Sequence, residues 1–176
     1  MKMLKLVVGP LQTNCYILYQ DGKCLIIDPG DEENNIIKRI EKLKVKPVGI
    51  LLTHNHFDHA MYAESLSNLY KVPVFDYKNL FEGNKKIEPF NFEVIYTPGH
   101  SKTSLTFYFK DYEFMFVGDF IFHENIGRVD LPGGSYQDMI ASLAKIKTYD
   151  DEIILYPGHG EETTIGHEKK YNNYFR

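Results

Sequence analysis

The stretch THNHFDH, residues 53–59, concentrates metal-binding side chains in one short segment. His54, His56, Asp58 and His59 all fall within six consecutive positions. Imidazole and carboxylate groups are the ligands that borderline divalent metal ions take in proteins. Four ligands from one loop would strain a tetrahedral shell around a single ion, whereas two pairs facing two ions can each be completed from elsewhere. The segment therefore predicts a metal centre that requires further ligands.

Three other segments end on the same kinds of side chain. EVIYTPGHS, residues 93–101, and EIILYPGHG, residues 152–160, each have the pattern of an apolar strand that stops at Pro-Gly and presents a histidine, His100 or His159. FMFVGDF, residues 114–120, presents Asp119 after a glycine that lets the backbone turn. Each of these three residues alone would be interpreted as a turn residue. Together they predict metal ligands gathered at the edge of a sheet.

The composition of the 176-residue chain is that of an ordinary globular protein, with 43% hydrophobic and 25% charged residues. Its length suffices for one domain with a substantial core. The formal net charge is −4 and like charges do not cluster, which argues against nucleic acid or an anionic membrane as a partner. The apolar run before Gly9 is too short for a signal peptide or a membrane span, so we expect a cytoplasmic protein.

Runs rich in β-branched and aromatic residues alternate along the chain with helical patterns. The first three strands, predicted at 4–8, 15–19 and 24–28, form an antiparallel meander in which Cys15 and Cys24 lie too far apart to pair and stay reduced. Further strands are predicted at 48–53, 72–75, 92–96, 104–109, 112–117 and 153–156, and helices at 31–44, 58–70, 135–148 and 163–173. The polar residues 78–89 are predicted to form a loop.

The order of the histidine and aspartate motifs resembles that of the metallo-β-lactamase superfamily. The segments GPLQTNCYIL, LIIDPGD, NIGRVDLPGG, YPGHG and TTIGHE are in addition similar to those of glyoxalase II-like hydrolases, small relatives of hydroxyacylglutathione hydrolase. The resemblance covers nearly the whole chain. It implies a single domain, residues 1–176, of the α/β (α+β) class: a four-layer αβ/βα sandwich of two mixed sheets flanked by helices, with the metals at one edge.

The resemblance also implies a role for each candidate ligand. One metal ion would be bound by His54, His56 and His100, the second by Asp58, His59 and His159, and Asp119 would bridge the two. The implied cofactors are two divalent ions. Zinc is the first expectation, and iron or manganese are alternatives, because a set of nitrogen and oxygen donors without thiolate admits all three.

The implied activity is hydrolysis of a small thioester, S-lactoylglutathione or a related hydroxyacyl thioester. Two divalent ions about 3.5–4 Å apart share a water whose pKa falls from ~15.7 toward ~7, which makes a bridging hydroxide available at neutral pH. A thiolate leaving group with a pKa of about 8.5 departs without a strong general acid. Asp58 and Asp119 are expected to act in catalysis as well as in metal binding.

The sequence departs from the glyoxalase II pattern around the ligands and not at them. The C-terminal helical domain that helps to hold glutathione in glyoxalase II is not expected here. Ala60, Met61 and Tyr62 stand where paired glycines are usual, and Phe120 stands where threonine is usual. We therefore expect the same chemistry with a different choice of substrate.

Several polar residues near these motifs have ordinary interpretations. Asp28, in LIIDPGD, either orients a ligand or forms a turn, and Arg128 and Asp130 are expected to pair within their own loop. The two histidines outside the candidate set, His123 and His167, are expected in surface or packing roles. A place for His123 in the wall of the pocket is the alternative.

Other functions are compatible with parts of the pattern. A mononuclear iron persulfide dioxygenase would keep the same histidine cluster, and oxygen uptake with glutathione persulfide would distinguish it; the LPGG segment after Asp130 favours the hydrolase. A phosphodiesterase or nuclease would require a basic groove, which the charge distribution does not predict. A non-catalytic metal-binding module is a fourth alternative, which the complete set of ligands does not favour.

Overall fold

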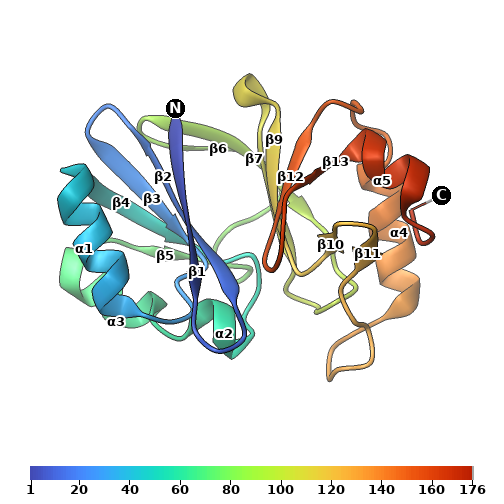
Figure 1. Ribbon diagram of the computed structural model, residues 1–176, viewed down its shortest axis with the longest axis horizontal. Helices are drawn as coiled ribbons and strands as arrows, with labels where there is room; N and C mark the ends of the chain where they lie inside the picture. The colour runs from blue at the N-terminus through green and yellow to red at the C-terminus, as the bar shows by residue number, and fades with distance from the viewer. Residues whose placement is uncertain (176) are drawn as a thin grey trace.

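The protein consists of two β-sheets that face each other and carry helices on their outer surfaces, as a computed structural model that describes residues 1–175 shows (Figure 1). The first sheet has the strand order β1 (Lys2–Val8), β2 (Thr13–Gln20), β3 (Lys23–Ile27), β4 (Lys46–Leu51) and β5 (Val74–Phe75). The second sheet has the order β13 (Thr163–Thr164), β12 (Ile154–Pro157), β9 (Phe114–Gly118), β8 (Leu105–Phe109), β7 (Phe90–Tyr96) and β6 (Gly83–Ile87).

The remaining described elements are a small hairpin and the helices. A separate two-stranded hairpin is formed by β10 (Ile121–Phe122) and β11 (Asn125–Ile126). The helices are α1 (Glu33–Leu43), α2 (Phe57–Ala60), α3 (Ala63–Tyr70), the 3₁₀ helix η1 (Lys110–Tyr112), α4 (Tyr136–Ile146) and α5 (Ile165–Tyr171). Within residues 1–175, no helix is long and apolar enough to cross a membrane.

The alternation of side chains along each strand produces four layers. In β2, Tyr16 and Leu18 face the second sheet, whereas Ile17 packs with Ile36 and Ile40 of α1. The second sheet is organised in the same way, because alternate residues of β9 face the first sheet or pack against α4 and α5. Both sheets are mixed. In the first sheet β4 is parallel to β3 and to β5, and in the second β9 is parallel to β12, while the other strand pairs of the two sheets are antiparallel. The predicted four-layer sandwich is confirmed.

The space between the sheets is filled mainly by aromatic rings. Phe109 stacks on Phe92 and on Phe114, with ring centroids 5.3 Å and 5.1 Å away. Tyr16, from the first sheet, lies with its ring centroid 4.9 Å from that of Phe116 in the second. Its hydroxyl donates a buried hydrogen bond of 2.7 Å to the carbonyl oxygen of Pro157. The core therefore fixes the end of β12, the strand that leads to His159.

Two predictions of secondary structure are wrong for identifiable reasons. Residues 78–89 are not a loop throughout, because β6 pairs antiparallel with β7 at the edge of its sheet. Edge strands commonly carry lysines, and so a polar edge strand resembles a loop in the sequence. The single helix predicted at 58–70 is divided into α2 and α3. The break occurs at Tyr62, whose backbone N–H donates to the carbonyl oxygen of Pro29 and not to a helical acceptor.

The cysteine prediction is confirmed. Cys24 lies opposite Tyr19 in the β2–β3 hairpin, and both Cys15 and Cys24 are free and buried. Burial raises the pKa of the Cys24 thiol to about 12 and also raises the pKa of Cys15, where the charge of Asp28 adds to the effect. Both thiols are therefore protonated at neutral pH and act as core side chains.

Replacement of Tyr16 by Phe should lower the free energy of unfolding by about 1 kcal/mol. The ring packing is retained and only the buried hydrogen bond is lost, while Asn14 Nδ2 still donates to the Pro157 carbonyl at 3.0 Å. Chemical denaturation measures the difference. The matched control is Tyr112→Phe, whose exposed hydroxyl donates to Gln20 and should contribute less than about 0.5 kcal/mol. Equal losses in the two variants would contradict a special role for the buried bond.

Candidate metal centre

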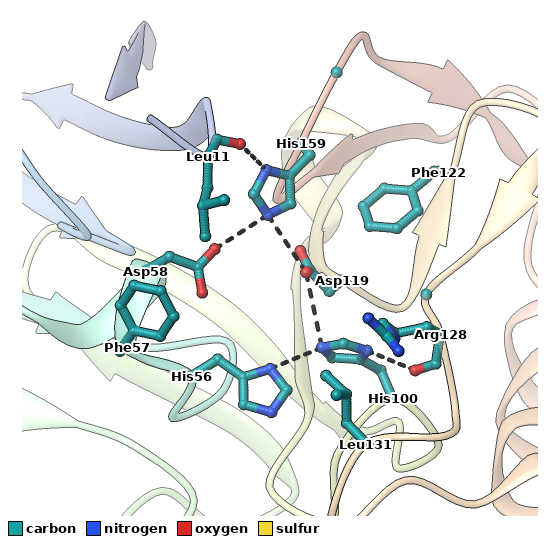
Figure 2. Close-up of a pocket in the computed structure, with 12 residues that line it drawn as sticks. Leu11, His56, Phe57, Asp58, His100, Asp119, Phe122, Arg128, Leu131 and His159 are labelled. Atoms are coloured by element: carbon teal, nitrogen blue, oxygen red, sulfur yellow. Dashed lines mark hydrogen bonds and ion pairs between the residues drawn. The ribbon is translucent and has the colours of Figure 1, made fainter. Parts of the chain in front are cut away.

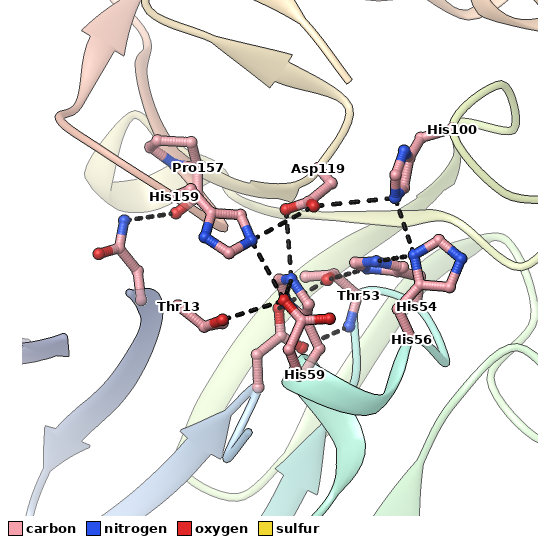
Figure 3. A network of polar contacts seen from close by, with 12 residues as sticks. Thr13, Thr53, His54, His56, His59, His100, Asp119, Pro157 and His159 are labelled. Carbon is pink, nitrogen blue, oxygen red and sulfur yellow. Dashed lines mark hydrogen bonds and ion pairs between the residues drawn. The ribbon is translucent and has the colours of Figure 1, made fainter. Parts of the chain in front are cut away.

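The candidate ligands meet at one edge of the two sheets (Figure 3). Strands β7, β9 and β12 run in the same direction, because β8 is antiparallel to both β7 and β9 and β12 is parallel to β9. Their carboxyl ends therefore share an edge. The seven residues are distributed as follows: His54 after β4, His56 at the start of α2, Asp58 and His59 within α2, His100 after β7, Asp119 after β9, and His159 after β12.

Three imidazoles form the first convergent group. The Nδ1 atom of His56 lies 3.1 Å from Nε2 of His54 and 2.9 Å from Nε2 of His100. In a tetrahedral zinc site with Zn–N bonds of 2.0–2.1 Å, ligand nitrogens lie about 3.3 Å apart. The three ring nitrogens therefore have close to the spacing that a single ion requires, and they are brought together from two distant segments of the chain.

A second group contains one carboxylate and two imidazoles. The Oδ2 atom of Asp58 lies 3.3 Å from Nε2 of His159 and 3.5 Å from Nε2 of His59. Asp58 is also held by the hydroxyl of Thr13, which donates to the same oxygen at 3.0 Å. This contact was not anticipated from the sequence, where Thr13 is part of the GPLQTN segment.

Asp119 lies between the two groups. Its Oδ1 atom is 3.2 Å from Nε2 of His59, and its Oδ2 atom is 3.4 Å from Nε2 of His159 and 3.7 Å from Nε2 of His100. Despite their proximity, Asp119 Oδ1 and His59 Nε2 are not aligned as a hydrogen bond, and within the described chain both are buried without a hydrogen-bond partner. Unpaired buried polar atoms are costly. A shared cation would satisfy both, and so these residues fit a metal centre.

Four of the five imidazoles are fixed through the ring nitrogen that faces away from the centre. The acceptors or partners of the Nδ1 atoms are Thr53 Oγ1 for His54 (3.1 Å), Asp28 Oδ2 for His59 (2.9 Å), the Arg128 carbonyl for His100 (2.8 Å) and the Leu11 carbonyl for His159 (3.0 Å). Such outer contacts orient metal-binding histidines and leave Nε2 free to coordinate. His56 is the exception and presents Nδ1.

Asp28 makes the densest set of these outer contacts. One carboxylate oxygen accepts the backbone N–H of Thr53 at 2.8 Å, and the other contacts the Thr53 hydroxyl at 2.6 Å and His59 Nδ1 at 2.9 Å. The residue is almost fully buried and has a positive φ of 51°. Both interpretations of Asp28 therefore apply, because its carbonyl accepts the N–H of Gly30 at 2.9 Å in a tight turn and its carboxylate orients His59.

The charges at the site favour a cation. Burial would raise the pKa of Asp58, but the hydrogen bond with His159 and the charge of His59 lower it to about 2. Burial likewise opposes ionisation of Asp119, yet contacts with His159 and His59 hold its pKa well below the usual value. Burial lowers the pKa of His59, but Asp28 and Asp119 outweigh this effect and raise it to about 10. The same negative field would stabilise divalent ions.

The close approach of Gly158 to the centre explains why a glycine precedes His159. A Cβ atom at this position would collide with Oδ1 of Asp119 and would lie 2.6 Å from Cε1 of His59. Only glycine allows the backbone of the 157–160 segment to approach the centre so closely. The glycine before His159 is therefore required for the site and not only for the turn.

The centre opens into a pocket with a volume of about 720 Å³ (Figure 2). Its walls outside the candidate ligands are mainly apolar, formed by Leu11, Phe57, Phe122 and Leu131. Leu11 and Phe57 are unusually accessible for such side chains, with 51% and 64% of their surface exposed. Neither was anticipated from the sequence, although Phe57 lies within THNHFDH and Leu11 within GPLQTNCYIL.

Arg128 and His123 are the polar residues near the pocket for which the sequence made a prediction. Arg128 lines the pocket, and its guanidinium forms two hydrogen bonds of 2.8 Å and 2.7 Å with the carboxylate of Asp130, as expected from the sequence. His123 does not line this pocket; the neighbouring Phe122 does. Arg128, the one arginine or lysine among the described residues that line the pocket, is therefore already paired.

Comparisons with known proteins agree with this geometry. A family model described as the metallo-beta-lactamase superfamily matches residues 8–82 and 76–159. The chain is 33% identical over 203 residues to the probable metallo-hydrolase YqgX of Bacillus subtilis. This match covers 98% of this chain and 96% of YqgX. It is 34% identical over 198 residues to the hydroxyacylglutathione hydrolase GloC of Haemophilus influenzae, with coverage of 94% and 93%.

A solved structure shows the same architecture over its full length. The crystal structure of the BLEG-1 B3 metallo-β-lactamase matches with a TM-score of 0.95 at 31% identity, covering 99% of each chain. Fold, order of motifs and sequence similarity thus lead to one assignment. The chain belongs to the metallo-β-lactamase superfamily.

Proposed function

We propose that the protein is a metal-dependent hydrolase of a small thioester. The observation that carries this proposal is the chemistry of the pocket wall. Apart from candidate ligands, the described residues that line the pocket are apolar or glycine, except Arg128. A guanidinium stays protonated and cannot act as a general acid. An amide or β-lactam nitrogen must be protonated to leave, whereas a thiolate leaves without that help.

The cofactor is proposed to be a pair of divalent ions, with zinc as the first expectation and iron or manganese as alternatives. His54, His56 and His100 would hold one ion, Asp58, His59 and His159 the other, and Asp119 would contact both. When bound, such ions supply Lewis acidity that activates water near neutral pH and polarises a carbonyl group. Asp58 and Asp119, both ionised and both in the pocket wall, would accept hydrogen bonds from the attacking water and orient it.

Hydrolysis of a thioester requires no reactant other than water. Oxygen from water bonds to the thioester carbonyl carbon, the C–S bond breaks, and its electron pair leaves with the sulfur. The products are a carboxylate, a thiol and one released proton at neutral pH. The apolar walls of Leu11, Phe57 and Leu131 favour an apolar group beside the carbonyl, and the pairing of Arg128 with Asp130 leaves this cation less available for an anionic thiol carrier.

Replacement of Asp119 by Ala should abolish turnover while the fold is retained. Loss of the residue between the two groups should reduce metal content, measured by elemental analysis, and lower kcat/KM for S-lactoylglutathione and other acyl thioesters by at least about a thousandfold, ~4 kcal/mol. His54→Ala should behave in the same way. Asp111→Ala, an exposed aspartate outside the pocket, is the control and should change neither quantity.

Three outcomes would count against the proposal. The first is wild-type protein with less than about one metal ion per chain and no thioesterase activity after reconstitution with zinc, iron or manganese. The second is oxygen uptake with glutathione persulfide that outpaces thiol release, which would support a mononuclear iron dioxygenase. The third is a higher kcat/KM for a β-lactam than for every thioester tested.

Asp28→Asn should weaken metal binding by about 10–100-fold, because the carboxylate orients His59 through a contact of 2.9 Å. Competition with a chromophoric chelator measures this change. The matched control is Asp21→Asn, because Asp21 has a similar positive φ of 50° but belongs to the β2–β3 turn. The same loss of affinity in both variants would mean that backbone strain, and not the contact with His59, causes the effect.

Phe57→Ala should lower kcat/KM by about tenfold for thioesters with an apolar acyl group, since roughly 1–2 kcal/mol of apolar contact is lost. It should change kcat/KM much less for S-acetyl thioesters, which reach the wall least. Phe81→Ala is the matched control, because Phe81 is 65% exposed and does not line the pocket. A uniform loss for every acyl chain would contradict a role of Phe57 in substrate choice.

A further inference from the structure

The two histidines outside the metal centre lie beside each other. His123 belongs to the turn between β10 and β11, and His167 belongs to α5; Figure 1 shows these elements on the same side of the second sheet. Their rings are stacked, with centroids 4.7 Å apart and an interplanar angle of 21°. The sequence predicts surface or packing roles for each residue separately, but it contains no sign that the two meet.

A carboxylate faces both rings. The Oε1 atom of Glu124 lies 3.0 Å from Nε2 of His167 and 3.9 Å from Nε2 of His123. One donor atom from each of these three residues can be chosen so that all lie within 4.8 Å of one another. On the other edge of the His123 ring, Nδ1 lies 3.3 Å from Oε1 of Glu161. A carboxylate at that position is the usual outer partner of a metal-binding histidine.

A buried polar network holds the turn and the helix together. Glu168 of α5 is fully buried, and its carboxylate accepts the backbone N–H of Glu124 at 3.2 Å and 3.0 Å and the hydroxyl of Thr163 at 2.6 Å. Asn172 donates to Glu168 at 2.7 Å and to the carbonyl of Asn125 at 2.9 Å. The side chains of His123, Glu124 and His167 therefore project from a backbone that is already fixed, which is what a binding site needs.

We propose that His123, Glu124 and His167 form a second site, separate from the centre described above, for a divalent transition-metal ion such as Zn²⁺. Two imidazoles and one carboxylate suit zinc, cobalt, nickel or copper, whereas calcium and magnesium prefer sets of oxygen ligands. The three side chains are between 32% and 49% exposed, so the site is open to solvent and its remaining coordination position is available to water.

An ion bound by His123, Glu124 and His167 would stabilise part of the pocket wall. Phe122 precedes His123 and lines the pocket, and Gly160, which also lines it, precedes Glu161. Binding of the ion would tie the β10–β11 turn to α5 and so restrict the movement of Phe122. The proposed role is therefore structural support of the pocket rim, and it does not depend on which reaction the centre performs.

The test is a count of bound ions. Wild-type protein and the His123→Ala, His167→Ala double variant are equilibrated with Zn²⁺ by dialysis, and the metal content is determined by elemental analysis. We expect the double variant to bind one ion per chain fewer than the wild type, whatever number the main centre holds. Asp119→Ala should leave this additional ion in place, which separates failure of this proposal from failure of the proposed centre.

A second variant, Glu124→Gln, is nearly isosteric and tests the site even if the double variant fails to fold. Glu124→Gln should weaken the additional site by at least about tenfold, while Glu162→Gln, which alters an exposed glutamate paired with Lys5 next to Glu161, should leave it unchanged. Zn²⁺ added beyond saturation of the centre should also raise the melting temperature of the wild type and not that of Glu124→Gln. Equal ion counts and equal affinities in the wild type, the double variant and Glu124→Gln would overturn the proposal.

Discussion

The constraint on which the site depends is the burial of charged groups in a row from one sheet to the other. Asp119, at the end of β9, contacts His59, and the opposite nitrogen of His59 contacts Asp28 at the end of β3. Asp28 also accepts the backbone N–H of Thr53 at the end of β4. Buried carboxylates are tolerated only where cations or hydrogen-bond donors compensate them. The two sheets therefore have to meet in one arrangement, which also positions the metal-binding atoms.

The same edge is secured by backbone hydrogen bonds between the sheets. The N–H of Leu105 donates to the carbonyl of Thr53 at 2.7 Å, and the N–H of Asn14 donates to the carbonyl of Gly158 at 2.7 Å. Away from this edge the sheets contact each other through apolar and aromatic side chains, which fix the distance between them but carry little directional information. Directional bonds are thus concentrated where the geometry of the ligands demands them.

Much of the candidate site could be predicted because the residues proposed as ligands have distinctive side chains at or near strand ends. The cluster at 53–59 and the repeated Pro-Gly-His pattern indicate the centre, and the structure brings all seven residues together. Apart from the contact of Asp28 with His59, the outer contacts could not be predicted in the same way. His100 and His159 are oriented by backbone carbonyls of Arg128 and Leu11, and every residue has a carbonyl. The meeting of His123 with His167 depends on a turn and a helix whose packing is set by the buried Glu168.

Except for Phe57, which lies in α2 beside Asp58, the apolar wall residues come from other segments than the candidate ligands, and this has a physical consequence. Ligands are held at strand ends or in α2, where neighbouring strands and outer contacts restrict them. Leu11 lies in the β1–β2 connection and Leu131 in the segment between β11 and α4, while Phe122 belongs to a two-residue strand. Loops accept substitution more readily than the strands that they connect. Changes in these walls can therefore alter which molecules the pocket admits, while the row of charged groups from Asp28 to Asp119 stays in place.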